Sequence, residues 1–250
     1  MSALSERLGP YKLRAQRHKK AAMQARNARD LKRAEEEFEE AESSIEEAFE
    51  EIEASGNFNP NVKENIDQAT KDQARELADC WGIRGGIYRE EGKIREAIDA
   101  YDNGYQLESE TRYEIHSTYN TVNRLVLRLL TNPNLLKQDS SATSDSRLLK
   151  PLPELLADSA RAIAAEWRNM TDPVWSLADM VLIKSILESP DETQWEELFK
   201  AKANNRFPFD SLGTVVKTLA KSELPISETL NQLAQRLDEY ATERWPLQKS

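Results

Sequence analysis

The chain has 250 residues, of which 39% are apolar and 31% are charged, and its formal net charge is −10. It has no run of about 18 consecutive apolar residues, as a membrane span needs, and residues 1–10 lack the apolar core of a signal peptide, so we expect a soluble cytoplasmic protein with no membrane partner. The single cysteine, Cys80, excludes an intrachain disulfide and a thiolate zinc site, and His18 and His116 have no second ligand at metal spacing, so we predict no metal site and no cofactor.

Charge is strongly polarised at the start of the chain. Residues 1–33 hold ten Lys and Arg against two acidic residues, whereas residues 34–54 hold eleven Glu and no basic residue. Two interpretations are open: the two segments neutralise each other as an antiparallel hairpin, or the basic helix binds an acidic partner such as nucleic acid. The acidity of the chain as a whole makes nucleic acid the weaker interpretation.

The chain is predicted to be all-α. Apolar residues recur at steps of three and four almost throughout, and no stretch alternates with a period of two. Breakers, the first of them Gly9-Pro10, divide the chain into segments of helical length. We predict helices over residues 11–27, 30–54, 63–91, 94–107, 112–131, 152–169, 173–188, 191–204, 210–222 and 226–243, with short connections that make neighbours antiparallel.

Residues 80–105 carry five of the eight glycines of the chain in an otherwise helical stretch. Their spacing resembles the tetratricopeptide repeat, whose pattern falls here on Trp81, Gly85, Tyr88, Ala97, Tyr101 and Gly104. The resemblance implies that Gly85 and Gly104 lie where helices cross and that Gly92 forms a left-handed turn. It also implies antiparallel helical hairpins stacked as a tetratricopeptide-repeat-like α-solenoid.

A degenerate copy of this spacing precedes it. Ala34, Phe38 and Ala41 repeat the alanine, aromatic and small positions of the second helix, and Ala22 and Ala25 replace the glycine and tyrosine of the first. We therefore expect the basic helix to lie antiparallel to the acidic one.

The following part of the chain carries a second resemblance. The stretches STYNTVNRLVLRLL (117–130) and DPVWSLADMVLIKSIL (172–187), with a helix that holds Trp195, resemble a repeat-containing region of bacterial regulatory proteins and of apoptosis signal-regulating kinases. In those kinases this region is described as binding tumour-necrosis-factor-receptor-associated factors. The resemblance covers about residues 75–220 and implies a regulatory, partner-sensing role in stress or defence signalling, with no chemistry of its own.

We expect a single α-solenoid over residues 1–250. Its parts are a charge-polarised hairpin at 11–54, the best-matching repeats at 63–131, a polar loop insertion at 132–151 and degenerate repeats at 152–244.

A binding face is predicted on the first helix of each hairpin, which lines the concave side of such an array. On helix 112–131 the apolar stripe is predicted to be buried and comprises Ile115, Tyr119, Val122, Val126 and Leu129. The opposite stripe is polar and comprises Tyr113, His116, Asn120 and Asn123, with Arg124 beside it. The corresponding stripe on helix 63–91 comprises Asp79, Gly82, Gly86 and Arg89. These residues either form a groove for a ligand or partner, or they face solvent and pack against the next hairpin.

The leading functional hypothesis is a non-enzymatic protein-binding scaffold or sensor that regulates a separate effector protein. The alternative is a sensor of a small nucleotide-like ligand in the same groove, where Arg84, Arg89, Arg112 and Arg124 converge on phosphate. Nucleic-acid binding through the basic N-terminal helix comes third. We expect no enzyme, because no ordering of nucleophile, base and acid stands out from the glutamate-rich background.

Overall fold

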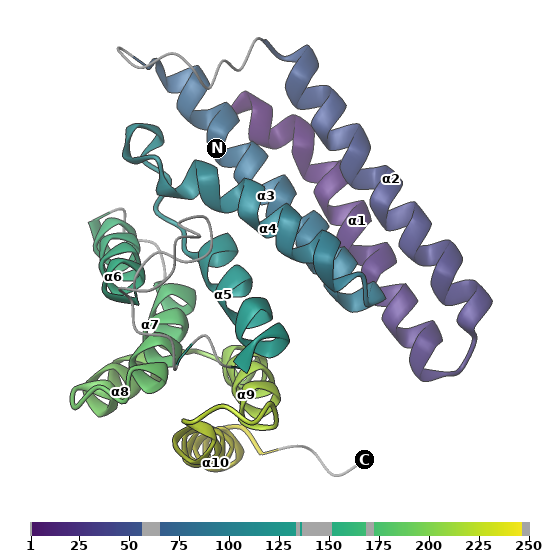
Figure 1. The fold of residues 1–250 in the computed structure, drawn as a ribbon. Helices are drawn as coiled ribbons and strands as arrows, with labels where there is room; N and C mark the ends of the chain where they lie inside the picture. Colours follow the sequence, from purple (N-terminus) through teal and green to yellow (C-terminus); the bar gives the residue numbers. More distant parts are fainter. Residues whose placement is uncertain (1, 57–65, 134–135, 137–151, 169–172, 247–250) are drawn as a thin grey trace. The chain divides into compact units, whose positions relative to one another are not determined.

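The computed structural model describes residues 2–56, 66–133, 136, 152–168 and 173–246 (Figure 1). It is all-α in these ranges, as predicted, and some consecutive helices pair as antiparallel hairpins. The chain divides into two compact units. We call Met1–Ile115 with Tyr119–Arg124 the N-terminal unit, and His116–Thr118 with Leu125–Ser250 the C-terminal unit.

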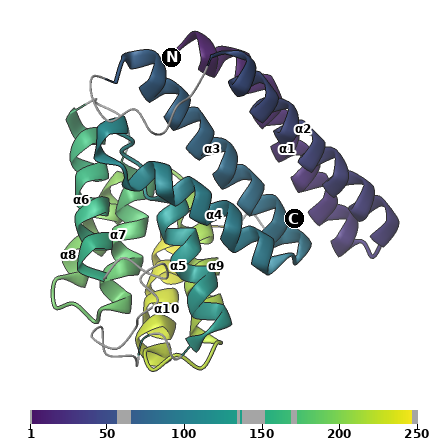
Figure 2. The same cartoon turned by 45° about the horizontal axis from the view of Figure 1, so that its top comes forward.

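Two hairpins make up most of the N-terminal unit (Figure 2). They are α1 (Ala3–Asn27) with α2 (Leu31–Ala54), and α3 (Gln68–Glu91) with α4 (Ile94–Ser109). A 3₁₀ turn (Thr111–Tyr113) and the first residues of α5 (Tyr119–Thr131) complete the unit. Helix α3 is central, because it packs against α1, α2 and α4.

The α1–α2 hairpin joins the basic segment to the acidic one. Ion pairs cross between the two helices from Arg7 to Glu51 (2.7 Å) and from Arg14 to Glu47 (2.6 Å). The residue number of the glutamate on α2 falls as that of the arginine on α1 rises, which is the order expected for antiparallel helices. Apolar faces meet beneath these pairs, and all five residues of the degenerate repeat spacing are buried: Ala22, Ala25, Ala34, Phe38 and Ala41. The prediction of a hairpin that neutralises its own charge is confirmed for these pairs.

Glycine closes the α3–α4 hairpin as predicted. Gly92 ends α3 with a φ of 95°, in the left-handed region that other residues adopt at a cost. Gly85 lies under the buried ring of Tyr101, and a Cβ added there would come within 2.8 Å of that ring. Gly104 also lies at a helix crossing, where it faces Asn120 of α5.

Helix α1 begins earlier than predicted. The expected break at Gly9-Pro10 is wrong, because α1 starts at Ala3 and runs through Pro10. Proline inside a helix costs about 3 kcal/mol through a lost hydrogen bond and a steric clash. Leu4 and Leu8 lie in the added turns and are buried, and each buried leucine stabilises by about 1.5–3 kcal/mol, which offsets that cost.

The predicted helix 112–131 is shorter in the structure. Helix α5 begins only at Tyr119, because Glu114 adopts a left-handed φ of 53° and ends the preceding 3₁₀ turn. Val122, Val126 and Leu129 are buried as predicted. Tyr119 was predicted to be buried with them, and this is wrong, since it is 46% exposed.

The C-terminal unit holds the rest of α5 and five further helices in its described part (Figure 2). These are α6 (Leu152–Arg168), α7 (Val174–Ile186), α8 (Glu192–Lys202), α9 (Phe207–Ala220) and α10 (Ser227–Arg244). Helix α7 is mostly buried and packs against α6, α8 and α9, while α9 and α10 form a hairpin. Most of the predicted polar loop at 132–151 lies outside the described residues. In the described part of the chain, each helix is too short or too polar to cross a lipid bilayer.

One prediction concerns the crossing of α3 and α4. Gly85→Ala is expected to lower the free energy of unfolding by about 1–2 kcal/mol, because overlap with the Tyr101 ring outweighs the better helix propensity of alanine. Gly9→Ala is the matched control, since a Cβ at this helical glycine meets no atom within 4 Å. Urea unfolding followed by circular dichroism measures both. A Gly85→Ala protein as stable as Gly9→Ala would contradict the assigned crossing.

A second prediction concerns the corner between α7 and α8. Hydrogen bonds from Lys184 and Ser189 lower the pKa of Asp191 from 3.8 to about 2. The ionised carboxylate therefore stabilises the fold fully above about pH 4, and this contribution is lost as the pH falls toward 2. Asp191→Asn is expected to lose less stability than the unsubstituted chain between pH 4 and 2, measured as thermal midpoints. Parallel pH profiles for the two proteins would show that the carboxylate does not contribute.

Candidate functional site

Polar groups from four helices of the N-terminal unit converge on Gly86. A Cβ placed on this glycine would lie 3.2 Å from Lys19 Nζ and 3.7 Å from each of the hydroxyl oxygens of Tyr101 and Tyr119. Arg89 follows three residues later on α3, on the same face of the helix. We call the following set the Gly86 cluster: Lys19 of α1, Gly86 and Arg89 of α3, Tyr101 of α4, and Tyr119 and Asn123 of α5.

Arg89 is held in place by its neighbours. Its Nη1 donates to Asn123 Oδ1 (2.9 Å), and its Nη2 and Nε donate to Glu90 Oε1 (2.9 and 3.2 Å). Asn123 in turn donates to the carbonyl oxygen of Tyr119 (2.8 Å). The guanidinium is therefore oriented by the first turn of α5 and by its own helix.

Lys19 differs from the lysine two turns before it. Lys12 donates to Glu76 and to Asp79, both at 2.7 Å, and although burial lowers its pKa, these carboxylates raise it above the ordinary value. Lys19 makes no hydrogen bond or ion pair within the described residues. Burial and the nearby Arg89 lower the pKa of Lys19, and Glu90 opposes this shift only in part. Lys19 is thus a partly buried cation, and Glu90 is the carboxylate that acts on it among the described residues.

The cluster is open to solvent on one side. The side chain of Arg89 is 33% exposed and Tyr119 is 46% exposed, while the ring of Tyr101 is buried beneath them. Two cations and one carboxylate, Glu90, meet here, so the charge is positive. A partly buried, positively charged and accessible patch can bind an anionic group.

A carboxylate from α4 fixes the start of α5. Glu108 accepts hydrogen bonds from the backbone N–H groups of Asn120 and Thr121 (3.1 Å each) and from both of their side chains (2.9 Å each). Burial raises the pKa of Glu108, and the four hydrogen bonds oppose that rise. This side chain caps the helix from a distance and thereby positions Tyr119.

Three of the sequence-predicted site residues, Gly86, Arg89 and Asn123, meet in the cluster. Gly82 is near but covered, because the Tyr119 ring lies 2.8 Å from where its Cβ would stand. Asn120 is 1% exposed and donates to the Ala78 carbonyl oxygen (3.0 Å) as well as to Glu108. For these two residues, packing against the next helix is the interpretation that the contacts bear out.

The other predicted site residues lie elsewhere. Asp79 pairs with Lys12, and Tyr113 is buried. Arg124 is buried, pairs with Asp102 and stacks over the Tyr105 ring at 4.2 Å. His116 belongs to the C-terminal unit and is not part of a helix. The predicted site residues therefore do not all line one groove.

The predicted convergence of four arginines is also wrong. Arg84 pairs with Glu46 and stacks over Phe49, and Arg112 pairs with Glu110 and stacks over Tyr113. Together with Arg124 they are engaged at separate places, which leaves Arg89 in the cluster. The cation that does accompany Arg89 is Lys19, and the sequence gives no signal that singles it out from ten basic residues in its segment.

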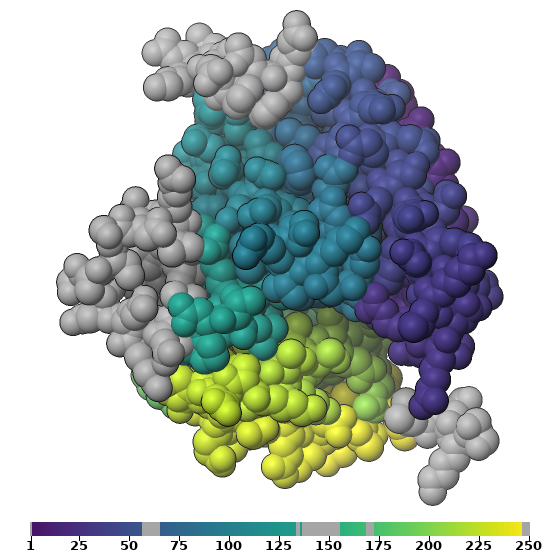
Figure 3. Space-filling view, turned by 45° about the vertical axis from the view of Figure 1, so that its right-hand side comes forward, coloured from purple at the N-terminus to yellow at the C-terminus, as the bar shows by residue number. Residues whose placement is uncertain are grey.

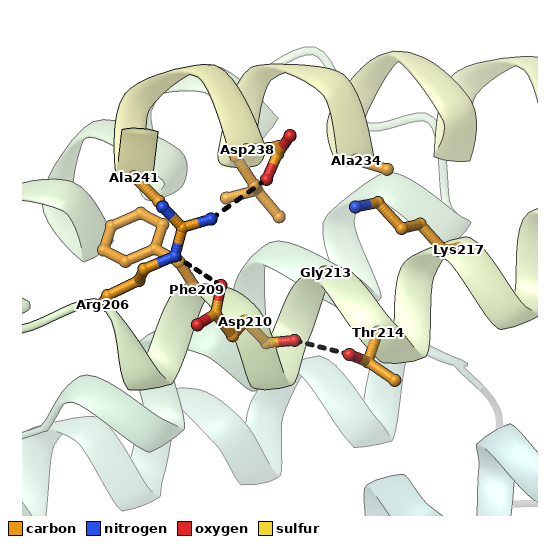
Figure 4. Close-up of a pocket in the computed structure, with 10 residues that line it drawn as sticks. Arg206, Phe209, Asp210, Gly213, Thr214, Lys217, Ala234, Asp238 and Ala241 are labelled. Carbon is orange, nitrogen blue, oxygen red and sulfur yellow. Dashed lines mark hydrogen bonds and ion pairs between the residues drawn. The ribbon is translucent and has the colours of Figure 1, made fainter. Parts of the chain in front are cut away.

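A groove lies between α9 and α10 of the C-terminal unit. Figure 3 shows the surfaces of these two helices in yellow-green and yellow, and Figure 4 shows the residues that line the groove. Its volume is about 330 Å³, and Arg206 spans it by pairing with Asp210 (3.0 Å) and Asp238 (3.4 Å). Lys217 extends toward it from α9 (Figure 4). The lining residues are Arg206, Phe209, Asp210, Gly213, Thr214, Lys217, Ala234, Leu237, Asp238 and Ala241. Its two basic residues, Arg206 and Lys217, are matched in number by Asp210 and Asp238, so it offers an anion less uncompensated charge than the Gly86 cluster does.

Two aromatic side chains of the C-terminal unit are exposed together. Trp175 is 46% exposed and Phe207 is 67% exposed, and their rings meet edge to face with centroids 5.6 Å apart. Aromatic side chains that stay in water are typical of protein contact surfaces.

The thiol of Cys80, the one cysteine of the chain, is a poor nucleophile near neutral pH. Cys80 is buried, and its burial raises its pKa to about 12, so the nucleophilic thiolate does not form near neutral pH. Within the described ranges, no three His, Cys, Asp or Glu side chains gather as a metal ion would require.

Comparison of the chain with models of known protein families, with curated proteins and with solved structures gives no match.

A third prediction tests the cap on α5. Glu108→Ala is expected to lower the free energy of unfolding by about 1–3 kcal/mol, because a helix cap is lost and the donors of Asn120 and Thr121 are left unpaired. Gln106→Ala, an exposed change on the same helix, is the control and should cost little. Equal denaturant midpoints for the two variants would contradict the cap.

Proposed function

We propose that this chain is a non-enzymatic binding module, a scaffold or sensor that regulates a separate effector protein. The observation that carries the proposal is the Gly86 cluster. It joins a lysine that has no hydrogen bond within the described residues, an oriented arginine and a half-exposed tyrosine around a buried glycine of α3. Such a surface is suited to holding a ligand group rather than to transforming it, because its one carboxylate, Glu90, is bound to Arg89.

A protein partner fits the remaining surface better than a small ligand alone. The exposed Trp175 and Phe207 add apolar contact area of the kind that anchors protein interfaces. A small nucleotide-like ligand stays the second candidate, because the same cluster offers positive charge and hydroxyl donors to a phosphate.

We also propose that the hairpins are tetratricopeptide-like. Three local features support this: Gly85 under Tyr101, the left-handed Gly92, and two antiparallel hairpins packed through α3. A stack of this kind presents the first helices of successive hairpins side by side, and the Gly86 cluster draws on α1, α3 and α5.

A fourth prediction tests this function. Arg89→Glu is expected to abolish retention of a stoichiometric partner by the tagged chain while its helical circular dichroism stays unchanged, because the cluster then repels an acidic group. Arg95→Glu makes the same charge change at an exposed position of α4 and should retain the partner. The measurement is purification from native lysate at two salt concentrations, with mass spectrometry of proteins and small molecules that co-elute.

The outcomes separate the candidates. A partner retained equally by both variants would refute the role of the cluster. A nucleotide that co-elutes with the unsubstituted chain in place of a protein, and is lost from Arg89→Glu, would favour the small-ligand function.

A further inference from the structure

The α1–α2 hairpin has one face that no other helix covers in the described part of the N-terminal unit. Helices α1 and α2 pack against each other and against α3, while α4 packs on the other side of α3 (Figure 2). The ion pairs Arg7–Glu51 and Arg14–Glu47 join α1 to α2 through side chains that stay partly in water, so they mark the face of the hairpin that points away from α3. We call this the outer face.

The outer face keeps four charged side chains that are exposed and make no hydrogen bond or ion pair with the described residues. The two basic ones follow Arg14 on α1 by three and six residues, and the two acidic ones precede Glu47 on α2 by seven and eight residues. The hairpin thus neutralises only part of its charge internally. The four residues are Arg17 and Lys20 of α1, which we call the basic row, and Glu39 and Glu40 of α2, which we call the acidic row.

The basic and acidic rows overlap along the axis of the hairpin. Arg14 pairs with Glu47, and His18 pairs with Glu37 at 2.8 Å. Arg17 lies between the two paired residues of α1, and the acidic row lies between the two paired residues of α2. Arg17 is therefore level with the acidic row.

This arrangement of charge favours one kind of partner. A nucleic acid carries one sign of charge, so it would meet the glutamates of α2 together with the cations of α1. A second copy of the chain carries both signs. A two-fold axis that runs parallel to the helices, between two outer faces, places α1 of each copy on α2 of the other and keeps every residue at its level. The basic row of each copy then meets the acidic row of the other, and every ion pair forms twice.

Apolar side chains accompany the basic row. Leu13 is 49% exposed, Pro10 is exposed, and they precede Arg17 by four and seven residues, so they share its face of α1. A second copy that covers this face would bury them and add apolar contact to the ion pairs. Four large apolar side chains are exposed in the described part of the N-terminal unit, and three of them lie on this hairpin: Leu13, Met23 and Leu31.

We propose that the outer face is a self-association surface through which two copies of the chain form a symmetric dimer. Each copy lays the basic row of its α1 on the acidic row of the other copy's α2. The proposal goes beyond the binding role above and does not depend on it, because Lys19, the residue of α1 in the Gly86 cluster, faces α3.

Reversal of the charges tests the proposal. Two double variants reverse one row each, and a control variant makes the same change in net charge as the first of them at exposed positions of the C-terminal unit. Sedimentation equilibrium at low ionic strength gives the dissociation constant of each protein, and circular dichroism establishes that each variant is folded. The basic-row variant is Arg17→Glu/Lys20→Glu, the acidic-row variant is Glu39→Lys/Glu40→Lys, and the control variant is Lys202→Glu/Lys221→Glu.

We expect the unsubstituted chain and the control variant to form dimers in the micromolar range. Each row variant is expected to have a dissociation constant at least about tenfold higher, because like charges then face each other. An equimolar mixture of the two row variants is expected to form a heterodimer, because opposite charges face each other again at both contacts. Added sodium chloride should weaken the dimer, since exposed ion pairs are screened by salt.

Three results would overturn the proposal. The first is an unsubstituted chain that stays monomeric throughout the micromolar range. The second is a dimer that neither row variant weakens. The third is a mixture of the two row variants that associates no more tightly than each variant does alone.

Discussion

The N-terminal unit depends on one face of α3 that carries glycines instead of larger side chains. Gly82, Gly85 and Gly86 lie at positions i, i+3 and i+4, which share one face of a helix. Each faces a different neighbour: the Tyr119 ring of α5, the Tyr101 ring of α4 and the Lys19 amine of α1. The helix-propensity cost of about 1 kcal/mol at Gly85 is offset because the Tyr101 ring that packs on it is buried, and burying an aromatic side chain stabilises by about 1.5–3 kcal/mol. The Tyr119 ring that packs on Gly82 is half exposed, so the compensation there is smaller.

Charge on α1 divides between two helices. One row of basic residues, with Arg7 and Arg14, faces the glutamates of α2 and is neutralised there. A second row, with Lys12 and Lys19, faces α3. The two lysines are two turns apart, yet one meets a pair of carboxylates and the other meets Arg89 and two tyrosines. The polarised composition of the segment therefore explains the hairpin, but it does not explain the position of Lys19 beside α3.

The order of helices was predictable because it is encoded locally. Prolines, glycines and caps mark the ends of segments, and the resemblance to the tetratricopeptide repeat implied the left-handed Gly92 and the crossing at Gly85. The predicted helix bounds are wrong where contacts between residues far apart in the sequence determine the structure. Helix α1 continues through Pro10 because Leu4 and Leu8 are buried, and the first N–H groups of α5 are capped by Glu108, which lies on another helix. The same reason applies to two predicted site residues. Periodicity places Asn120 and Arg124 on the polar face of the helix, whereas tertiary contacts bury both.

The Gly86 cluster shows how helix packing brings together residues that sequence patterns do not single out. Tyr119 has two roles, because its ring packs on Gly82 while its hydroxyl reaches Gly86, so a change there alters the fold and the site together. Arg89 is similarly tied to α5 through Asn123. Lys19 is different, because burial and the nearby Arg89 lower its pKa and its amine makes no hydrogen bond within the described residues. The charge pattern of α1 does not separate it from Lys12, whose amine two carboxylates bind.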